Sequence, residues 1–233
     1  ESVSETVTET ESSLTSASEP NTETTVVVTD PSEWSAEEII EFYKSAASKS
    51  QSRTKSVKKM TLKELTVNDG DGALGGFIDF CMPFFIAALE KNSTEFDGIT
   101  GGFDNLELSD TTSVRAYKDG VYTVVEMKMK EQTDGTYGSP FDGSVGHAIS
   151  VLGNVSTAVA EFPDFKIDFE NADIKVRYSE PTVKVKINKD GIIERGTWSY
   201  MANVDIKHLD ISGVMVDTAD AAIFYEIKVG GGF

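Results

Sequence analysis

The sequence predicts an α+β domain: a curved antiparallel sheet packed around one buried apolar helix, with two amphipathic helices beside it. Three observations predict this fold class. The run Ala73–Leu89 is apolar, two other segments have helical periodicity, and period-two segments joined by tight turns fill much of the remainder. Since successive strands connect through hairpins, the sheet should be antiparallel and not doubly wound.

The composition divides the chain into two parts. Residues 1–30 consist mainly of Ser, Thr and Glu and contain no Lys, Arg or aromatic residue. Such a segment cannot bury enough apolar surface to offset the entropy lost on ordering. We therefore expect a disordered acidic stalk over 1–30 and a single α+β domain over 31–233.

The first helix is expected just after Trp34. Ser35 and Glu38 have the spacing of a capping box, and Trp34 could pack on Ile39 as a hydrophobic staple. The apolar face of this helix consists of Ile39, Ile40, Phe42, Tyr43, Ala46 and Ala47. A basic region, Lys44–Lys63, begins in this helix. We expect either a solvated surface or contact with an anionic wall polymer, a lipid headgroup or the acidic stalk itself.

The run Ala73–Leu89 is predicted to be a core helix kinked at Pro83. As a helix it would be roughly 25 Å long, short of the roughly 30 Å hydrocarbon core, and Asp79 would be costly there. Two alternatives stay open: a helix lining a lipid-sized cavity, or a membrane-inserting segment. Cys81 also lies in this run.

The rest of the chain is expected to form strands, apart from one amphipathic helix over Asp142–Phe162. A strand is expected over Met60–Val67 and a loop over Asn92–Gly102. The clearest hairpin, Val114–Glu131, turns at Lys118–Gly120, and a second hairpin turns at Lys189–Gly191, since Asp-Gly tolerates positive φ. The later strands contain Phe165, Ile167, Phe169, Ile174, Val176, Tyr178, Val183, Val185, Ile187, Trp198, Tyr200, Ala202, Val204, Ile206, Ile223, Tyr225, Ile227 and Val229.

Charge and residue counts argue against several function classes. The net charge of −18 makes nucleic acid an improbable partner, because phosphate binding needs a basic surface. A single cysteine excludes an internal disulfide framework. Two histidines, His147 and His208, cannot by themselves form a histidine metal site. No cofactor and no metal are expected.

Three local motifs have weak functional readings. Gly70–Gly75 matches G-x-G-x-x-G but follows an amphipathic strand, so a turn is favoured over a dinucleotide site. Asn68, Asp69 and Asp71 resemble a calcium loop in composition only. His147 lies near Ser150 without a hydrolase signature, and His208 is expected to form a surface ion pair with Asp205 or Asp210.

Several stretches together resemble a family of uncharacterised secreted lipoproteins of gut Gram-positive bacteria. They are WSAEEIIEFYK, NSTEFDGITGGF, GHAISV, INKDGIIERGTWSY and the terminal GGGF. The resemblance implies a lipid-modified cysteine just before Glu1 and an extracellular, membrane-anchored location. It implies no activity and no site residues. The pattern is also distantly similar to half-barrel lipoprotein carriers.

These observations favour a monomeric, surface-tethered, non-enzymatic domain that binds an apolar or lipid-like ligand. The candidate ligand-binding residues are Phe77, Phe80, Phe84, Phe85, Trp198 and Tyr200. The alternative is a structural or adhesive surface module with a solid core and exposed recognition loops. An enzyme would require a cleft that brings His147 or His208 together with carboxylates.

Overall fold

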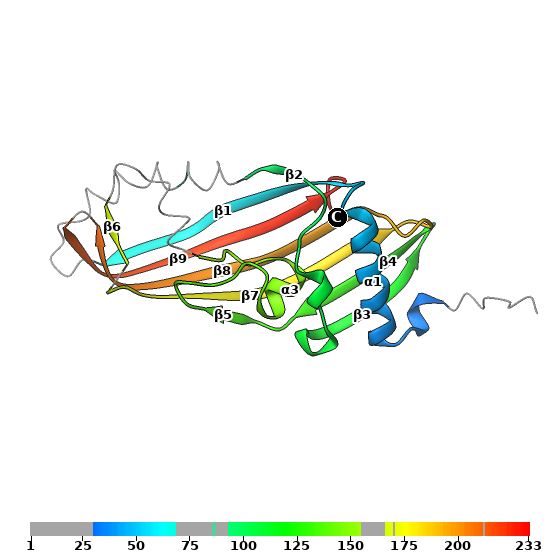
Figure 1. Ribbon diagram of the computed structural model, residues 1–233, viewed down its shortest axis with the longest axis horizontal. Coiled ribbons are helices and arrows are strands. Elements are labelled where there is room, and N and C mark those ends of the chain that lie inside the picture. The colour runs from blue at the N-terminus through cyan, green and yellow to red at the C-terminus, as the bar shows by residue number, and fades with distance from the viewer. Residues whose placement is uncertain (1–29, 69–85, 87–92, 155–165, 170, 212) are drawn as a thin grey trace, which may run out of the picture.

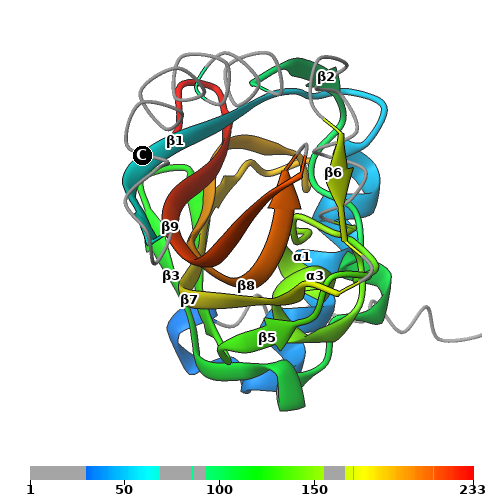
Figure 2. The same ribbon diagram turned by 90° about the vertical axis from the view of Figure 1, so that its left-hand side faces the viewer.

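A strongly curved antiparallel sheet dominates the computed structural model of the protein. The structure describes residues 30–68, 86, 93–154, 166–169, 171–211 and 213–233. Nine strands form the sheet in the order β2-β1-β9-β8-β7-β4-β3, with β5 beside β7 and β6 beside β8 (Figure 1). Seen from its end, the sheet curls around its inner face (Figure 2).

The element bounds show how far the long strands extend. The strands are β1 Lys55–Asn68, β2 Glu95–Asp97, β3 Thr111–Asp119, β4 Tyr122–Met129, β5 Gln132–Asp134, β6 Ile167–Asp168, β7 Asp173–Ile187, β8 Ile193–Ile211 and β9 Val214–Val229. The α-helices are α1 Ala36–Ser50 and α3 Gly143–Ala148, and the short 3-10 helices are Pro31–Glu33, Phe103–Asn105 and Leu108–Asp110.

The predicted α+β class, with three helices, is wrong: 53 % of the structure is strand, and the described residues contain two α-helices. The long strands β7, β8 and β9, of 15, 19 and 16 residues, supply most of the core from their own inward rows. The predicted apolar helix Ala73–Leu89 lies outside the described residues except for Ile86, which is 41 % exposed.

The second amphipathic helix was predicted too long. It begins at Gly143, as expected, but ends at Ala148 and not at Phe162. Ser150 has a left-handed backbone with φ 69°, and the Val151 N–H donates to the Pro140 carbonyl over 2.8 Å. The apolar spacing that predicted helix therefore continues into a buried loop, and residues 155–165 are not described.

The predicted turns and the first helix are confirmed. Gly120 and Gly191 have φ values of 60° and 77° in the β3–β4 and β7–β8 hairpins. Ser35 and Glu38 form both hydrogen bonds of the capping box, at 3.2 and 2.7 Å. The Trp34 ring was expected on Ile39; the contact that the structure shows is edge-on against Phe42, with the centroids 4.9 Å apart.

Two expected boundaries differ from the structure. The segment Asn92–Gly102 contains the short strand β2, which pairs with the start of β1. The strand expected from Met60 begins earlier, at Lys55, so that Lys58 lies within it.

No helix in the described part of the chain has the length and hydrophobicity needed to cross a bilayer.

Candidate ligand-binding face

The inner face of the sheet has two regions that differ in how they are covered. Helices α1 and α3 both lie over one end, which we call the covered half (Figure 1). Further along the long strands lie the tyrosine cluster, defined as Tyr178, Tyr200 and Tyr225, and the β1 row, defined as Lys58, Met60 and Leu62. These two groups form the candidate site.

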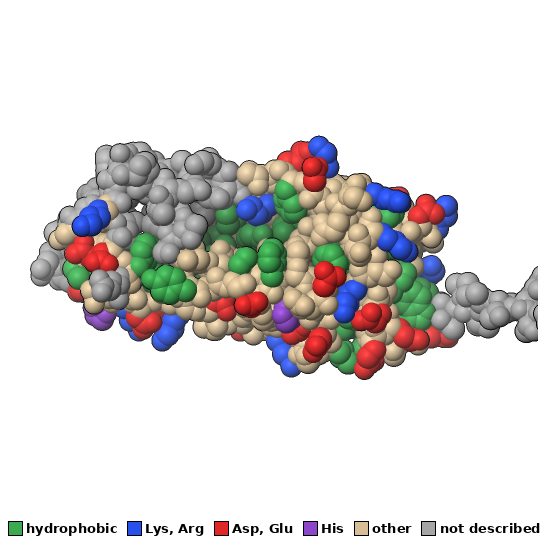
Figure 3. Space-filling model, in the orientation of Figure 1, with side chains coloured by type: hydrophobic (Ala, Val, Ile, Leu, Met, Phe, Trp, Pro, Cys, Tyr) green, Lys and Arg blue, Asp and Glu red, His purple; other side chains and the backbone are tan. Residues whose placement is uncertain are grey.

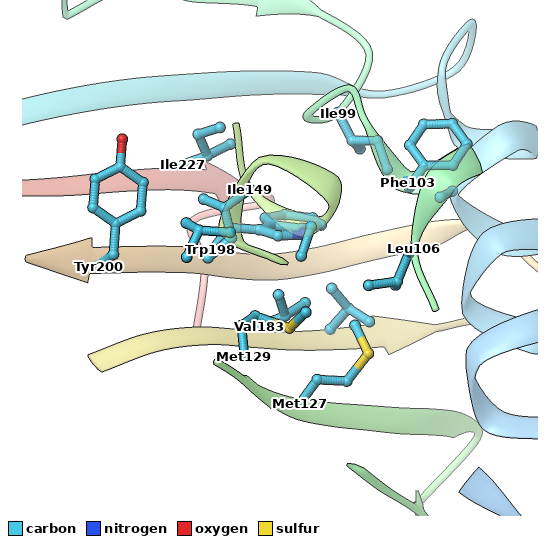
Figure 4. Packing of buried hydrophobic residues seen from close by; sticks show 14 of the residues in the cluster. Ile99, Phe103, Leu106, Met127, Met129, Ile149, Val183, Trp198, Tyr200 and Ile227 are labelled. Atoms are coloured by element: carbon cyan, nitrogen blue, oxygen red, sulfur yellow. The ribbon is translucent and has the colours of Figure 1, made fainter. Parts of the chain in front are cut away.

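The covered half is a packed core centred on Trp198. This side chain is completely buried, and its Nε1 donates to the Tyr43 hydroxyl over 2.9 Å. Gly196 makes room for the ring, since a Cβ at that position would lie 2.5 Å from it. Burial raises the pKa of Tyr43, so the hydroxyl stays protonated. The structure thus places Trp198, a predicted ligand residue, between the sheet and α1 (Figure 4).

The tyrosine cluster lies next to this core on three adjacent central strands. Tyr200 is directly opposite Tyr225 in the β8–β9 register, and their rings stack with centroids 4.6 Å apart. Tyr178, on β7, meets the Tyr200 ring edge-on at 5.2 Å. Figure 4 shows Tyr200 apart from the residues around Trp198, with its hydroxyl directed away from the strand.

Among the described residues, two hydroxyls of this cluster are buried and make no hydrogen bond of good geometry. They belong to Tyr200 and to Tyr178, which has the Asp134 carboxylate and the Leu152 backbone near it, whereas the Tyr225 hydroxyl lies 3.3 Å from Ser150 Oγ. Burial, followed by the proximity of Tyr225, raises the pKa of Tyr200 well above its usual range. The hydroxyl is therefore a neutral donor and acceptor. Leaving such a group unpaired costs about 1–3 kcal/mol, so a polar atom of a bound molecule or water would be stabilised here.

The β1 row lies across β9 from the tyrosine cluster. Its three residues pair in register with buried core residues of β9: Lys58 with Ile227, Met60 with Tyr225 and Leu62 with Ile223. Side chains directly opposite in an antiparallel pair lie on the same face, so the row faces inward. All three row residues are only partly buried, in contrast to the buried rows of β7 and β8.

Lys58 is the unusual member of the row. Within the described residues its ammonium group has neither an ion pair nor a hydrogen-bond partner, while the neighbouring Lys55 pairs with Glu95 at 3.3 Å. Burial lowers the pKa of Lys58. Figure 3 shows hydrophobic side chains on this side of the molecule, between the helix-bearing end and the grey segments.

The basic region Lys44–Lys63 does not form one continuous surface. Lys44 lies on α1 and pairs with Glu41 at 3.2 Å. On β1, Lys59 points outward while Lys58 points inward. The predicted contact with an anionic wall polymer stays a prediction.

The two histidines lie on different elements, His147 on α3 and His208 on β8. His147 is at the end of α3, with Nδ1 2.9 Å from an Asp110 carboxylate oxygen. His208 is exposed, has a left-handed backbone with φ 55°, and forms no ion pair within the described residues, contrary to expectation. The described residues contain no group of three His, Cys, Asp or Glu side chains that could hold a metal.

Other predicted site residues fall outside the described part of the chain. These are Phe77, Phe80, Phe84, Phe85, Asp79 and Cys81, together with the Gly70–Gly75 motif and the acidic residues Asp69 and Asp71. The sequence placed Lys58 in the basic region Lys44–Lys63 but did not predict that it faces inward, because the strand was expected to begin at Met60. It placed Tyr178 and Tyr225 on strands but gave them no role.

Comparison with protein-family models, curated proteins and solved structures found no match for this chain.

Proposed function

We propose that this protein is a non-enzymatic binding domain that holds an apolar, lipid-like ligand on the inner face of its sheet, alongside β1. The observation that carries the proposal is the β1 row, in which Met60 and Leu62 face the core side of the sheet but stay partly exposed. By contrast, the inward row of β7 is buried, and so is that of β8 apart from Ile206.

The neighbouring surface suits an elongated apolar molecule. The buried rings of Tyr225 and Tyr200 support this row from β9 and β8. Transfer of apolar surface from water contributes about 25 cal/mol per Å², so a ligand chain along this row would gain affinity from contact area alone. The unpaired Tyr200 hydroxyl adds one polar contact.

The test is to identify what the purified full chain carries. Native mass spectrometry and organic extraction should reveal a bound apolar molecule, and an environment-sensitive apolar dye should bind at one site. The proposal fails if no apolar molecule co-purifies and the dye finds no site.

A pair of substitutions locates the binding. Met60→Glu places a carboxylate in the β1 row and should weaken dye binding more than tenfold. Thr61→Glu places the same charge on the neighbouring, outward-facing position and should leave dye binding unchanged. Melting temperatures check that both variants fold. If Met60→Glu does not fold, Leu62→Ala replaces it as a milder change in the β1 row.

The alternative function is a structural or adhesive module with a solid core. The covered half favours it, since Trp198 is fully buried and bonded to Tyr43. The same dye and extraction experiments separate the two functions, because a solid module binds neither.

We also propose that the domain is tethered outside the cell through the segment preceding Trp34. The support is the Ser-, Thr- and Glu-rich composition of residues 1–30 and the resemblance to secreted lipoproteins. Fractionation of the native producing cells tests it: recovery of the full-length native protein in the cytosol would contradict the tether.

A further inference from the structure

We propose that the ligand of this face is a single-chain amphiphile with one anionic group, a carboxylate or phosphate, which binds the Lys58 ammonium. This inference rests on the proposed function and adds the charge of the ligand to it. The proposed arrangement places the anionic group at Lys58 and the apolar chain along Met60 and Leu62.

Lys58 lies in an otherwise apolar row on the inner face of β1. It precedes two apolar residues in the inward row of β1 and is paired in register with Ile227, a buried residue. Lysine in such a row usually extends its stem over apolar surface and brings its ammonium to water. Here the side chain is partly buried, so its charge is only partly hydrated.

Lys58 also has no counterion among the described residues. A partly desolvated charge without a counterion is costly, and proteins normally pair it. Within the described residues Lys58 has no carboxylate, although the whole chain carries 39 Asp and Glu. An anion brought by a ligand would supply the missing charge, and charge-assisted hydrogen bonds are about twice as strong as neutral ones.

The overall charge selects the kind of anion. A protein with net charge −18 repels polyanions, and a single lysine offers one binding point. A small free anion would gain little from this one contact. An amphiphile with one anionic group also gains from its apolar chain, which the β1 row can contact.

The experiment measures binding of defined probes to the full chain by calorimetry and dye displacement. The probes are oleate, its uncharged methyl ester, lysophosphatidic acid and inorganic phosphate. Oleate or lysophosphatidic acid should bind about tenfold or more tightly than methyl oleate, and the stronger of the two identifies the anionic group. Phosphate alone should not displace the dye.

Three variants test whether the preference for anionic probes depends on Lys58. Lys58→Gln should remove the preference for the anionic probes while leaving methyl oleate binding unchanged. Lys59→Gln makes the same charge change at the adjacent, outward-facing position and should keep the preference. Lys58→Arg should restore most of it. The melting temperature of Lys58→Gln should not fall, because the substitution removes an unpaired charge.

The outcomes separate the two proposals. Equal binding of oleate and methyl oleate, or equal loss in Lys58→Gln and Lys59→Gln, overturns the anionic ligand but leaves an apolar site. Displacement of the dye by phosphate as readily as by oleate also overturns it. Failure of all three lipid probes to bind overturns the proposed function itself.

Discussion

The covered half and the tyrosine cluster each contain a buried tyrosine, but the two tyrosine hydroxyls differ in hydrogen bonding. In the covered half the buried Tyr43 hydroxyl accepts a hydrogen bond from Trp198. In the tyrosine cluster the equally buried Tyr200 hydroxyl has no hydrogen-bond partner among the residues that the structure describes. The comparison teaches that burial alone does not identify a structural residue: the covered half completes its polar contacts, whereas the tyrosine cluster leaves a hydroxyl that a ligand could use under the proposed function.

The largest expected effect is in the covered half. Trp198→Ala removes a fully buried ring that packs between β8 and α1, and should lower the free energy of unfolding by about 3–5 kcal/mol. Urea-induced unfolding followed by circular dichroism measures it. A loss below about 1 kcal/mol would show that this half is not the core that its packing indicates.

A matched pair of hydroxyl deletions sharpens the comparison. Tyr43→Phe leaves the Trp198 Nε1 without its acceptor and should cost about 1–3 kcal/mol. Tyr200→Phe deletes an unpaired hydroxyl and keeps the stacked ring, so the ligand-free protein should be unchanged or slightly more stable. The same unfolding experiment compares them, and equal destabilisation would remove the distinction between the two regions.

The smallest effect concerns Glu126, on the outer face behind the covered half. Its carboxylate accepts hydrogen bonds from Arg115 at 2.6 Å and from Lys184 and Tyr117 at 2.9 Å. Partial burial alone would raise the pKa of Glu126, but these bonds outweigh burial and lower it to about 2. Because the group is partly hydrated, we expect Glu126→Gln to cost about 1 kcal/mol at pH 7.

The pH dependence of that cost has a definite sign. The folded pKa lies below the ordinary value of 4.5, so the stabilisation is present above that value and is lost as the pH falls from about 5 to about 2. Wild type and Glu126→Gln should therefore converge in stability at acid pH. A difference that grows on acidification would contradict the assignment.

Prediction from the sequence succeeded where the signal is local. The capping box at Ser35 and Glu38 and the turns at Gly120 and Gly191 depend on a few consecutive residues, and all are confirmed. It failed for the helix expected over Asp142–Phe162. The left-handed backbone of Ser150 and a hydrogen bond from Val151 to Pro140 end that helix. Neither feature changes the apolar spacing in the sequence, so the spacing could not predict it.

The sequence by itself determined the first helix, the antiparallel hairpins and the acidic character of the chain. Apolar spacing and turn chemistry depend on residues close together in the sequence, and net charge depends on composition alone. Only the tertiary structure decided that strands dominate, that Trp198 is bonded to Tyr43, and that Lys58 and Tyr200 face inward with no partner in the described part of the chain. The physical reason is that burial and pairing depend on the register between strands from distant parts of the chain. In particular, β1 and β9 meet only in the folded sheet.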